Sequence, residues 1–129
     1  MEHPNEHVIR KGFDAFMRGD METARTIFQP NVVWHVAGRG PLSGDYRGFE
    51  EIARWGGQLF ERSGGTLREE IATIVANEGW AVQVAYYQAE RNGRKIRDQT
   101  VNVYRMVDGR VSECWVYFSD VKAFDEFWA

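Results

Sequence analysis

Two dipeptides, Asn92-Gly93 and Asp108-Gly109, constrain the fold of the chain's second half more than any other feature of the sequence. Each lies between runs rich in β-branched and aromatic residues. Such pairs favour the two-residue turns of β-hairpins because they tolerate positive φ. The sequence therefore predicts an antiparallel meander, in which each strand pairs with the next. The four strands expected here cover 67–76, 80–90, 95–107 and 111–118.

The first half of the chain predicts mainly helices. Apolar residues at helical spacing indicate a helix over 5–18, which Gly19 ends. Asp20 is a suitable N-cap for a second helix, and we expect Pro30 to stop it because proline cannot continue a helix. The remaining elements are a strand over 32–36, a helix from near Gly48 to Gly64-Gly65, and a short helix over about 121–128.

This order of elements, α-α-β-α-β-β-β-β-α, predicts a single α+β domain over 1–129. One curved antiparallel sheet would carry three helices on one face. A strongly bent sheet covered in this way encloses a cone-shaped cavity, and a ligand would enter at the open end of the cone.

Composition and charge narrow the classes of function. The 16 Lys and Arg against 19 Asp and Glu give a net charge of −3, which is too acidic for a typical nucleic-acid binder. No apolar run approaches the roughly 18 residues of a membrane span, and the polar N-terminus does not fit a signal peptide. The single cysteine, Cys114, cannot form an internal disulfide. We expect a cytoplasmic protein that uses no metal and no cofactor.

Aromatic residues make up 14% of the chain, which is more than the core of so small a domain needs. The surplus predicts an aromatic-lined pocket or an oligomer interface. An aromatic-rich core is the alternative interpretation.

Several segments together carry a family resemblance. They are Arg18-Gly19-Asp20, the run from Phe28 to His35, Gly38 with Pro41-Leu42-Ser43-Gly44, the helix start at Gly48, Asp108-Gly109-Arg110-Val111, and Trp115 with Asp120. The chain resembles nuclear transport factor 2-like domains, within their SnoaL-like and ketosteroid-isomerase-like branch, over nearly its whole length. The resemblance implies the cone-shaped α+β roll. It leaves function open, because this fold hosts isomerases, cyclases, epoxide hydrolases, dehydratases and non-catalytic binders.

The resemblance also implies three catalytic residues. His35 lies where ketosteroid isomerases place a general-base Asp, and Asn102 lies where they place an oxyanion-stabilising acid. Asp120 matches the Asp proposed as the acid/base of SnoaL-type cyclases. The isomerases' Tyr on the first helix has no counterpart, because Phe13 or Gly12 falls at that place.

Each of these three residues also has a structural interpretation. His35 could exchange a proton near its reference pKa of about 6.5, or could hydrogen-bond the 38–41 turn. Asp120 could act as an acid or base, alone or paired with His35, or could only cap the last helix. Asn102 could donate to a developing enolate oxygen, or lie at an exposed edge or dimer-face position.

The resemblance directs Cys114, Val116 and Phe118 of the last strand toward the cavity, and Trp115 and Tyr117 toward the convex face. A convex face with Trp and Tyr would be an exposed apolar patch, so we expect a homodimer through it. The side chains expected to contact the substrate are Phe13, Trp55, Tyr104, Val116 and Phe118, with Trp55 alternatively a core residue.

We therefore expect a cofactor-independent enzyme that moves a proton beside the carbonyl group of a small apolar compound. The alternative is a non-catalytic module that binds a small ligand or a partner chain. Epoxide hydrolysis by an activated water is a third interpretation, but the expected strands do not supply the Asp-Arg-Asp set that it needs.

Overall fold

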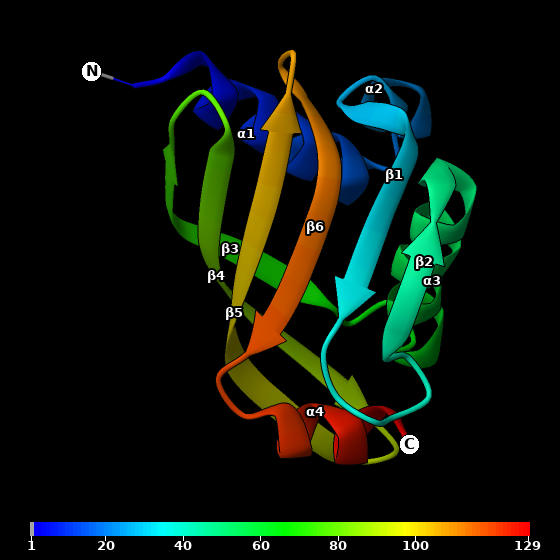
Figure 1. Ribbon diagram of the computed structural model, residues 1–129. Coiled ribbons are helices and arrows are strands. Elements are labelled where there is room, and N and C mark those ends of the chain that lie inside the picture. Colours follow the sequence, from blue (N-terminus) through cyan, green and yellow to red (C-terminus); the bar gives the residue numbers. More distant parts are fainter. Residues whose placement is uncertain (1) are drawn as a thin grey trace.

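The computed structural model describes residues 2–129, which form a bent six-stranded sheet with helices against its concave side (Figure 1). The helices are α1 (Pro4–Arg18), α2 (Met21–Arg25), α3 (Gly48–Arg62) and α4 (Val121–Trp128). The strands are β1 (Phe28–Val36), β2 (Gly44–Arg47), β3 (Arg68–Ala76), β4 (Trp80–Arg91), β5 (Arg94–Val107) and β6 (Arg110–Phe118). The predicted α+β class with a curved sheet is confirmed.

The strand order in the sheet is β2-β1-β6-β5-β4-β3. The predicted meander accounts for β3 to β6, and Asn92 and Asp108 take positive φ angles of 53° and 51° at its two tight turns. One pair departs from the expected antiparallel arrangement. β1 and β6 run parallel, because the chain crosses from β1 to β6 only after α3 and the rest of the meander.

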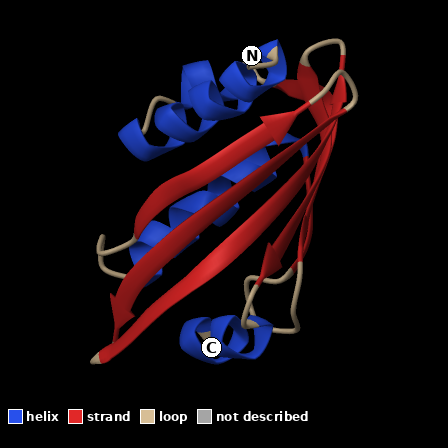
Figure 2. Cartoon of the chain, turned by 90° about the vertical axis from the view of Figure 1, so that its left-hand side faces the viewer, coloured by secondary structure: helices blue, strands red, loops and turns tan. Residues whose placement is uncertain are grey.

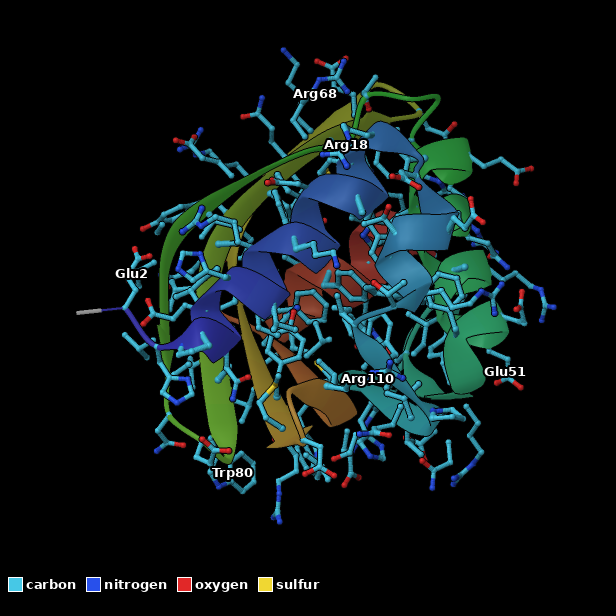
Figure 3. All side chains as sticks on the ribbon, turned by 90° about the horizontal axis from the view of Figure 1, so that it is seen from above. Glu2, Arg18, Glu51, Arg68, Trp80 and Arg110 are labelled. Carbon is cyan, nitrogen blue, oxygen red and sulfur yellow. The ribbon has the colours of Figure 1, made fainter. Side chains whose placement is uncertain are left out.

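The sheet owes its bend to irregular pairing within the long strands. The register between β3 and β4 shifts between Ile71 and Thr73, and that between β5 and β6 shifts between Arg105 and Met106. Such bulges bend a strand and increase its twist. Figure 2 shows the long strands running along one side of the helices, and Figure 3 shows, from above, the sheet curving around α1.

The second helix is shorter than predicted. α2 ends at Arg25, and the Ile27 carbonyl already accepts a hydrogen bond from the Val111 N–H of β6 at 2.8 Å. Pro30 therefore stops no helix. It is exposed and lies in an irregular part of β1, where proline's missing N–H is tolerated.

Strand β2 was not predicted from the sequence. Its four residues include Gly44 and Asp45, which are residue types depleted in strands, so no pattern indicated it. It forms because it pairs antiparallel with β1 across the connecting loop 37–43. None of the helices within residues 2–129 has the length and apolar character of a membrane-crossing segment.

Helix α4 closes one end of the cone and is held from two sides (Figure 1). The Asp125 carboxylate accepts hydrogen bonds from the backbone N–H groups of Arg39 at 2.9 Å and Gly40 at 3.0 Å, in the loop after β1. On the other side, Arg91 of β4 donates to the carbonyl oxygens of Phe127 at 3.2 Å and Ala129 at 2.7 Å. These bonds fix the helix that supplies part of the interior wall.

We expect Asp125→Ala to lower the free energy of unfolding by about 2 kcal/mol, because two backbone N–H groups lose charge-assisted hydrogen bonds. Chemical denaturation followed by tryptophan fluorescence measures the change. Glu126→Ala is the matched control on the same helix, since Glu126 is exposed and pairs only with exposed Lys122. Its effect should stay within about 0.5 kcal/mol. Equal losses in both variants would contradict the anchoring role of Asp125.

Candidate active site

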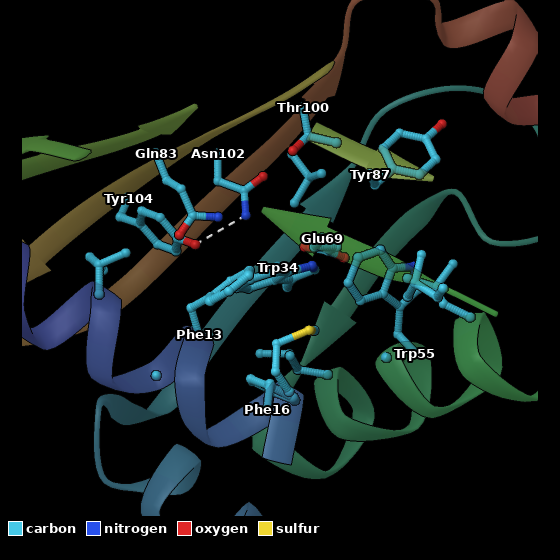
Figure 4. Close-up of a pocket in the computed structure, with 18 of the residues that line it drawn as sticks. Phe13, Phe16, Trp34, Trp55, Glu69, Gln83, Tyr87, Thr100, Asn102 and Tyr104 are labelled. Carbon is cyan, nitrogen blue, oxygen red and sulfur yellow. Dashed lines mark hydrogen bonds between the residues drawn. The ribbon is translucent and has the colours of Figure 1, made fainter. Parts of the chain in front are cut away.

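An apolar pocket lies between the concave face of the sheet and helices α1, α3 and α4 (Figure 4). Its free volume is about 110 Å³, whereas roughly 10–15 Å³ on the same measure is enough for one water. Much of the helical wall is aromatic, with Phe13 and Phe16 on α1 and Trp55 on α3. The pocket can therefore hold a small organic ligand and offers it mainly apolar contact.

Polar side chains gather on the sheet wall of this pocket. Thr100, Asn102 and Tyr104 occupy alternate positions of β5 and so project to one side, and Gln83 of β4 lies directly across from Asn102. Asn102 Nδ2 donates a hydrogen bond to the Tyr104 hydroxyl oxygen at 3.0 Å (Figure 4). Desolvation raises the pKa of Tyr104 well above its usual value, so this hydroxyl stays neutral.

Five buried side-chain polar atoms have no hydrogen-bond partner within residues 2–129, and all five belong to residues that line this pocket. Buried polar atoms are normally paired, and leaving one unpaired costs about 1–3 kcal/mol. The wall of the pocket therefore carries a cost in stability that no hydrogen bond within residues 2–129 offsets. The atoms are Trp34 Nε1, Gln83 Oε1, Tyr87 Oη, Asn102 Oδ1 and Trp128 Nε1.

Glu69 brings a carboxyl group to the pocket from β3, where it pairs with Tyr87 of β4. Desolvation raises the pKa of Glu69 from the usual 4.5 to about 7. No positive charge or hydrogen-bond donor within residues 2–129 offsets this upward shift. A carboxyl group with a pKa near neutrality can both take and release a proton at physiological pH.

His35 does not line the pocket. Its neighbour Trp34 does, and strand alternation sends the His35 side chain to the opposite, convex face of the sheet. There the imidazole Nδ1 lies 2.7 Å from an Asp45 oxygen, Nε2 lies 2.5 Å from a Glu113 oxygen, and the ring stacks on Trp115. The His35 ring thus bonds to two carboxylates rather than to the following turn.

The pKa of His35 is also shifted in a different way from that of a base buried in an apolar cavity. Desolvation lowers its pKa, but the hydrogen bonds and charges of Asp45 and Glu113 outweigh this effect, so the pKa is raised overall. A raised pKa favours the protonated ring near neutral pH. The structure therefore places His35 in a charged cluster on the outer surface.

Asp120 takes the capping role that was the alternative to catalysis. Its carboxylate accepts a hydrogen bond from the Ala123 N–H at 3.0 Å at the start of α4, and its own N–H donates to Asp98 at 2.9 Å. Its side chain is exposed and is not part of the pocket lining. The side-chain partners of His35 are Asp45 and Glu113, and that of Asp120 is the Ala123 N–H, so the predicted His35–Asp120 pair does not form.

The other predicted site residues come together in the pocket. Its lining includes Asn102 and all five of the residues expected to contact a substrate, namely Phe13, Trp55, Tyr104, Val116 and Phe118. Their placement is a matter of geometry, and their roles in binding or catalysis remain predictions. Within residues 2–129 no cluster of three or more His, Cys, Asp or Glu side chains is arranged to bind a metal ion.

Sequence reasoning missed Glu69 and Gln83, although a signal for each was present. Glu69 alternates with Leu67 and Ile71, so an acid shares a strand face with apolar residues. Gln83 likewise alternates with Ala81 and other small or aromatic residues of β4, and it is only 3% exposed. A polar residue on the apolar face of a strand either destabilises the core or belongs to a functional site.

A small α+β cone with an apolar pocket and a few polar groups on its sheet wall is the architecture of nuclear transport factor 2-like proteins. Comparison with known families assigns the chain to one family within this group. The chain belongs to the SnoaL-like domain family, whose sequence profile matches residues 9–114.

Among individual proteins, the chain is similar to an uncharacterised protein of Mycobacterium tuberculosis, with 26% identity over 123 residues, covering 95% of this chain and 94% of that protein. The solved structure of Bal32a, from a soil-derived mobile gene cassette, has 31% identity and a TM-score of 0.92, covering 98% of this chain and 97% of that chain. IdmH of Streptomyces antibioticus, described as a candidate polyketide cyclase, has 20% identity and a TM-score of 0.76, with 92% and 94% covered. At that identity IdmH supports the fold alone.

We expect Glu69→Gln to be more stable than the wild-type protein at pH 8 and equally stable at pH 4. Below pH 4.5 the carboxyl group is neutral in both folded and unfolded chains. Between about 4.5 and 7 the unfolded chain ionises first, so folding becomes progressively less favourable. Above pH 7 the buried charge should cost about 3 kcal/mol, which the amide avoids.

Urea denaturation of both proteins across this pH range measures the difference. Glu70→Gln serves as the control, because Glu70 is the adjacent residue of β3 and is exposed. If the two variants shift stability alike, the carboxyl group of Glu69 is not desolvated and the prediction is wrong.

Proposed function

We propose that this SnoaL-like domain is a cofactor-independent enzyme in which Glu69 moves a proton at a carbon beside the carbonyl group of a small, mainly apolar compound. The observation that carries the proposal is a carboxyl group without a protein partner, in an apolar pocket, with a pKa raised to about 7. A general base works best when its pKa lies near the working pH. Glu69 takes the role that sequence reasoning assigned to His35 or Asp120.

Removal of such a proton creates an enolate, whose oxygen carries negative charge. Tyr104 is suited to stabilise that oxygen, because its hydroxyl is neutral, buried and part of the pocket wall. Asn102 supports it by donating to the Tyr104 oxygen, which leaves the hydroxyl proton free to be donated and strengthens that donor. Glu69 and Tyr104 both line the pocket, so a compound bound there would lie between the base and the hydroxyl donor.

The apolar wall supports the same reaction. Phe13, Trp55, Val116 and Phe118 line the pocket around these polar groups and would replace water around a bound ring. Exclusion of water keeps the pKa of Glu69 high and strengthens the interaction between the enolate and Tyr104. Family membership agrees with this chemistry at the coarser level of isomerases and cyclases.

The proposal is tested by proton exchange, which needs no knowledge of the natural substrate. Indanone, β-tetralone and cyclohexenone are incubated with the protein in deuterated water, and proton NMR follows the loss of the signals beside the carbonyl. We expect exchange that rises with pH to a plateau above about 7, as Glu69 ionises. Glu69→Gln should slow exchange at least about 100-fold. Glu70→Gln should not change it.

Two results would contradict the proposal. If His35→Gln or Asp120→Asn abolishes exchange while Glu69→Gln does not, the sequence-based assignment of the base is correct instead. If the wild-type protein binds these ketones but exchanges none of their protons faster than buffer does, the domain is a binding module rather than an enzyme.

We also propose that two copies associate through the convex face of the sheet. This face carries large apolar side chains in the open, with Trp80 at 42% and Tyr117 at 49% exposure, and the ring of Trp80 lies 6.1 Å from that of Trp115. A self-complementary pair of such faces would cover this area in a twofold dimer.

Light scattering during gel filtration tests the dimer. We expect the wild-type protein to elute as a dimer and Tyr117→Arg to shift it toward monomer, because the charge would be buried in the interface. Val121→Arg, which replaces an exposed apolar residue on α4 instead of the sheet, is the control and should remain dimeric. A monomeric wild-type protein would contradict the proposal.

A further inference from the structure

Two adjacent glycines, Gly56 and Gly57, lie inside helix α3, and proton transfer at Glu69 gives no reason for them. A glycine in the middle of a helix destabilises the fold relative to alanine. Neither residue has a positive φ angle, the backbone conformation that favours glycine. The reason for each glycine therefore lies in its surroundings rather than in its backbone.

Gly56 faces the pocket, whereas Gly57 faces away from it. The inner face of α3 repeats at helical spacing, and its members all line the pocket, namely Ile52, Trp55, Gly56, Leu59 and Phe60. Gly57 lies outside this stripe and is exposed. Gly56 stays half-buried at the centre of the stripe, although Ile52 and Leu59 on the neighbouring turns are buried. The wall that α3 contributes thus lacks a side chain at its centre.

The space beside Gly56 is open rather than closed by tight packing. Beyond its own helix, a β-carbon on Gly56 would meet only the ring of Phe16 on α1 among residues 2–129, at an ordinary contact distance of 3.7 Å. Gly12 of α1 shows the opposite case, because a β-carbon there would overlap the Ile27 side chain. Phe16 lines the pocket opposite α3 (Figure 4). Packing therefore does not require a glycine at position 56.

We propose that Gly56 determines the size of the ligand that the pocket accepts. The absent side chain leaves room between α3 and Phe16, and part of a bound compound occupies that room. A larger residue at position 56 would project into a pocket of only about 110 Å³ and would compete with the ligand for this volume. The inference rests on the proposed function only for the choice of ketones as ligands, because exclusion by size does not depend on Glu69.

The melting temperatures of two alanine variants test whether the fold needs either glycine. Gly56→Ala and Gly57→Ala should each melt about 2–5 °C above the wild type, because alanine is the better helix former. Gly56→Ala should gain at least as much as Gly57→Ala, since its methyl group also contacts the Phe16 ring. A Gly56→Ala protein that melts below the wild type would show that packing requires this glycine, and would overturn the inference.

Calorimetric titration with β-tetralone, which has two rings, and with cyclohexenone, which has one, tests the effect on ligands. We expect Gly56→Leu to weaken the binding of β-tetralone at least about tenfold, and that of cyclohexenone less. Gly56→Ala should weaken the binding of β-tetralone about threefold, so the test does not depend on the folding of the leucine variant.

Gly57→Leu is the matched control, because it adds the same side chain one residue further along, on the exposed side of α3. It should bind both ketones as the wild type does. The inference is wrong if Gly56→Ala and Gly56→Leu bind β-tetralone as tightly as the wild type, or if Gly57→Leu weakens binding equally. It is also wrong if the wild type binds neither ketone, since ring compounds then do not enter the pocket.

These titrations separate the inference from the proposed function. Exchange of ketone protons that depends on Glu69, with β-tetralone bound equally by the wild type and Gly56→Leu, would leave the catalytic proposal standing and overturn this one. Binding that weakens with the size of residue 56, without proton exchange, would support this inference in a non-catalytic binding protein.

Discussion

The bend of the sheet around α1 is the constraint on which the rest of this structure depends. Bulged pairing in the strands turns the concave face into the wall of a cone, which helices α1, α3 and α4 cover without filling. In a flat sheet the inward positions of β3, β4 and β5 would pack directly against helices, and polar side chains there would be excluded. The bend leaves space, and that space tolerates Glu69, Gln83 and Asn102 on an otherwise apolar face.

The pocket holds polar groups at a cost in stability. A desolvated carboxyl group and five unpaired buried atoms all oppose folding, and within residues 2–129 these unpaired atoms occur only around the pocket. Local departures of this kind from good packing are typical of functional sites, whose chemistry requires groups that the fold alone would not retain. His35 differs from these groups, because Asp45 and Glu113 pair both nitrogens of its ring on the convex face.

Much of the fold was accessible from the sequence because its signals are local. The turns at Asn92-Gly93 and Asp108-Gly109 specify the meander by backbone conformation alone. Elements that depend on distant partners were less predictable. β2 exists only through its pairing with β1, and the short α2 reflects the bond between Ile27 and Val111 of β6.

The residues of the candidate site could be predicted where the alternation of side chains along a strand showed which of them point inward. Asn102 and Tyr104 have the same parity on β5, and both lie in the pocket. The family position suggested His35, but Trp34 takes the inward place on β1, and a one-residue difference moves a side chain to the opposite face. Strand alternation could have marked Glu69 as an inward position, but its raised pKa arises from desolvation in the folded protein, which alternation alone does not reveal.

The protonation of Glu69 in the folded protein is the most direct measure of the central claim. A carbon-detected NMR titration of its side-chain carboxyl signal, identified by its absence from Glu69→Gln, gives the pKa without any substrate. The structure predicts a midpoint near pH 7. A midpoint near 4.5 would show a carboxyl group in water and would remove the base on which the proposed chemistry depends.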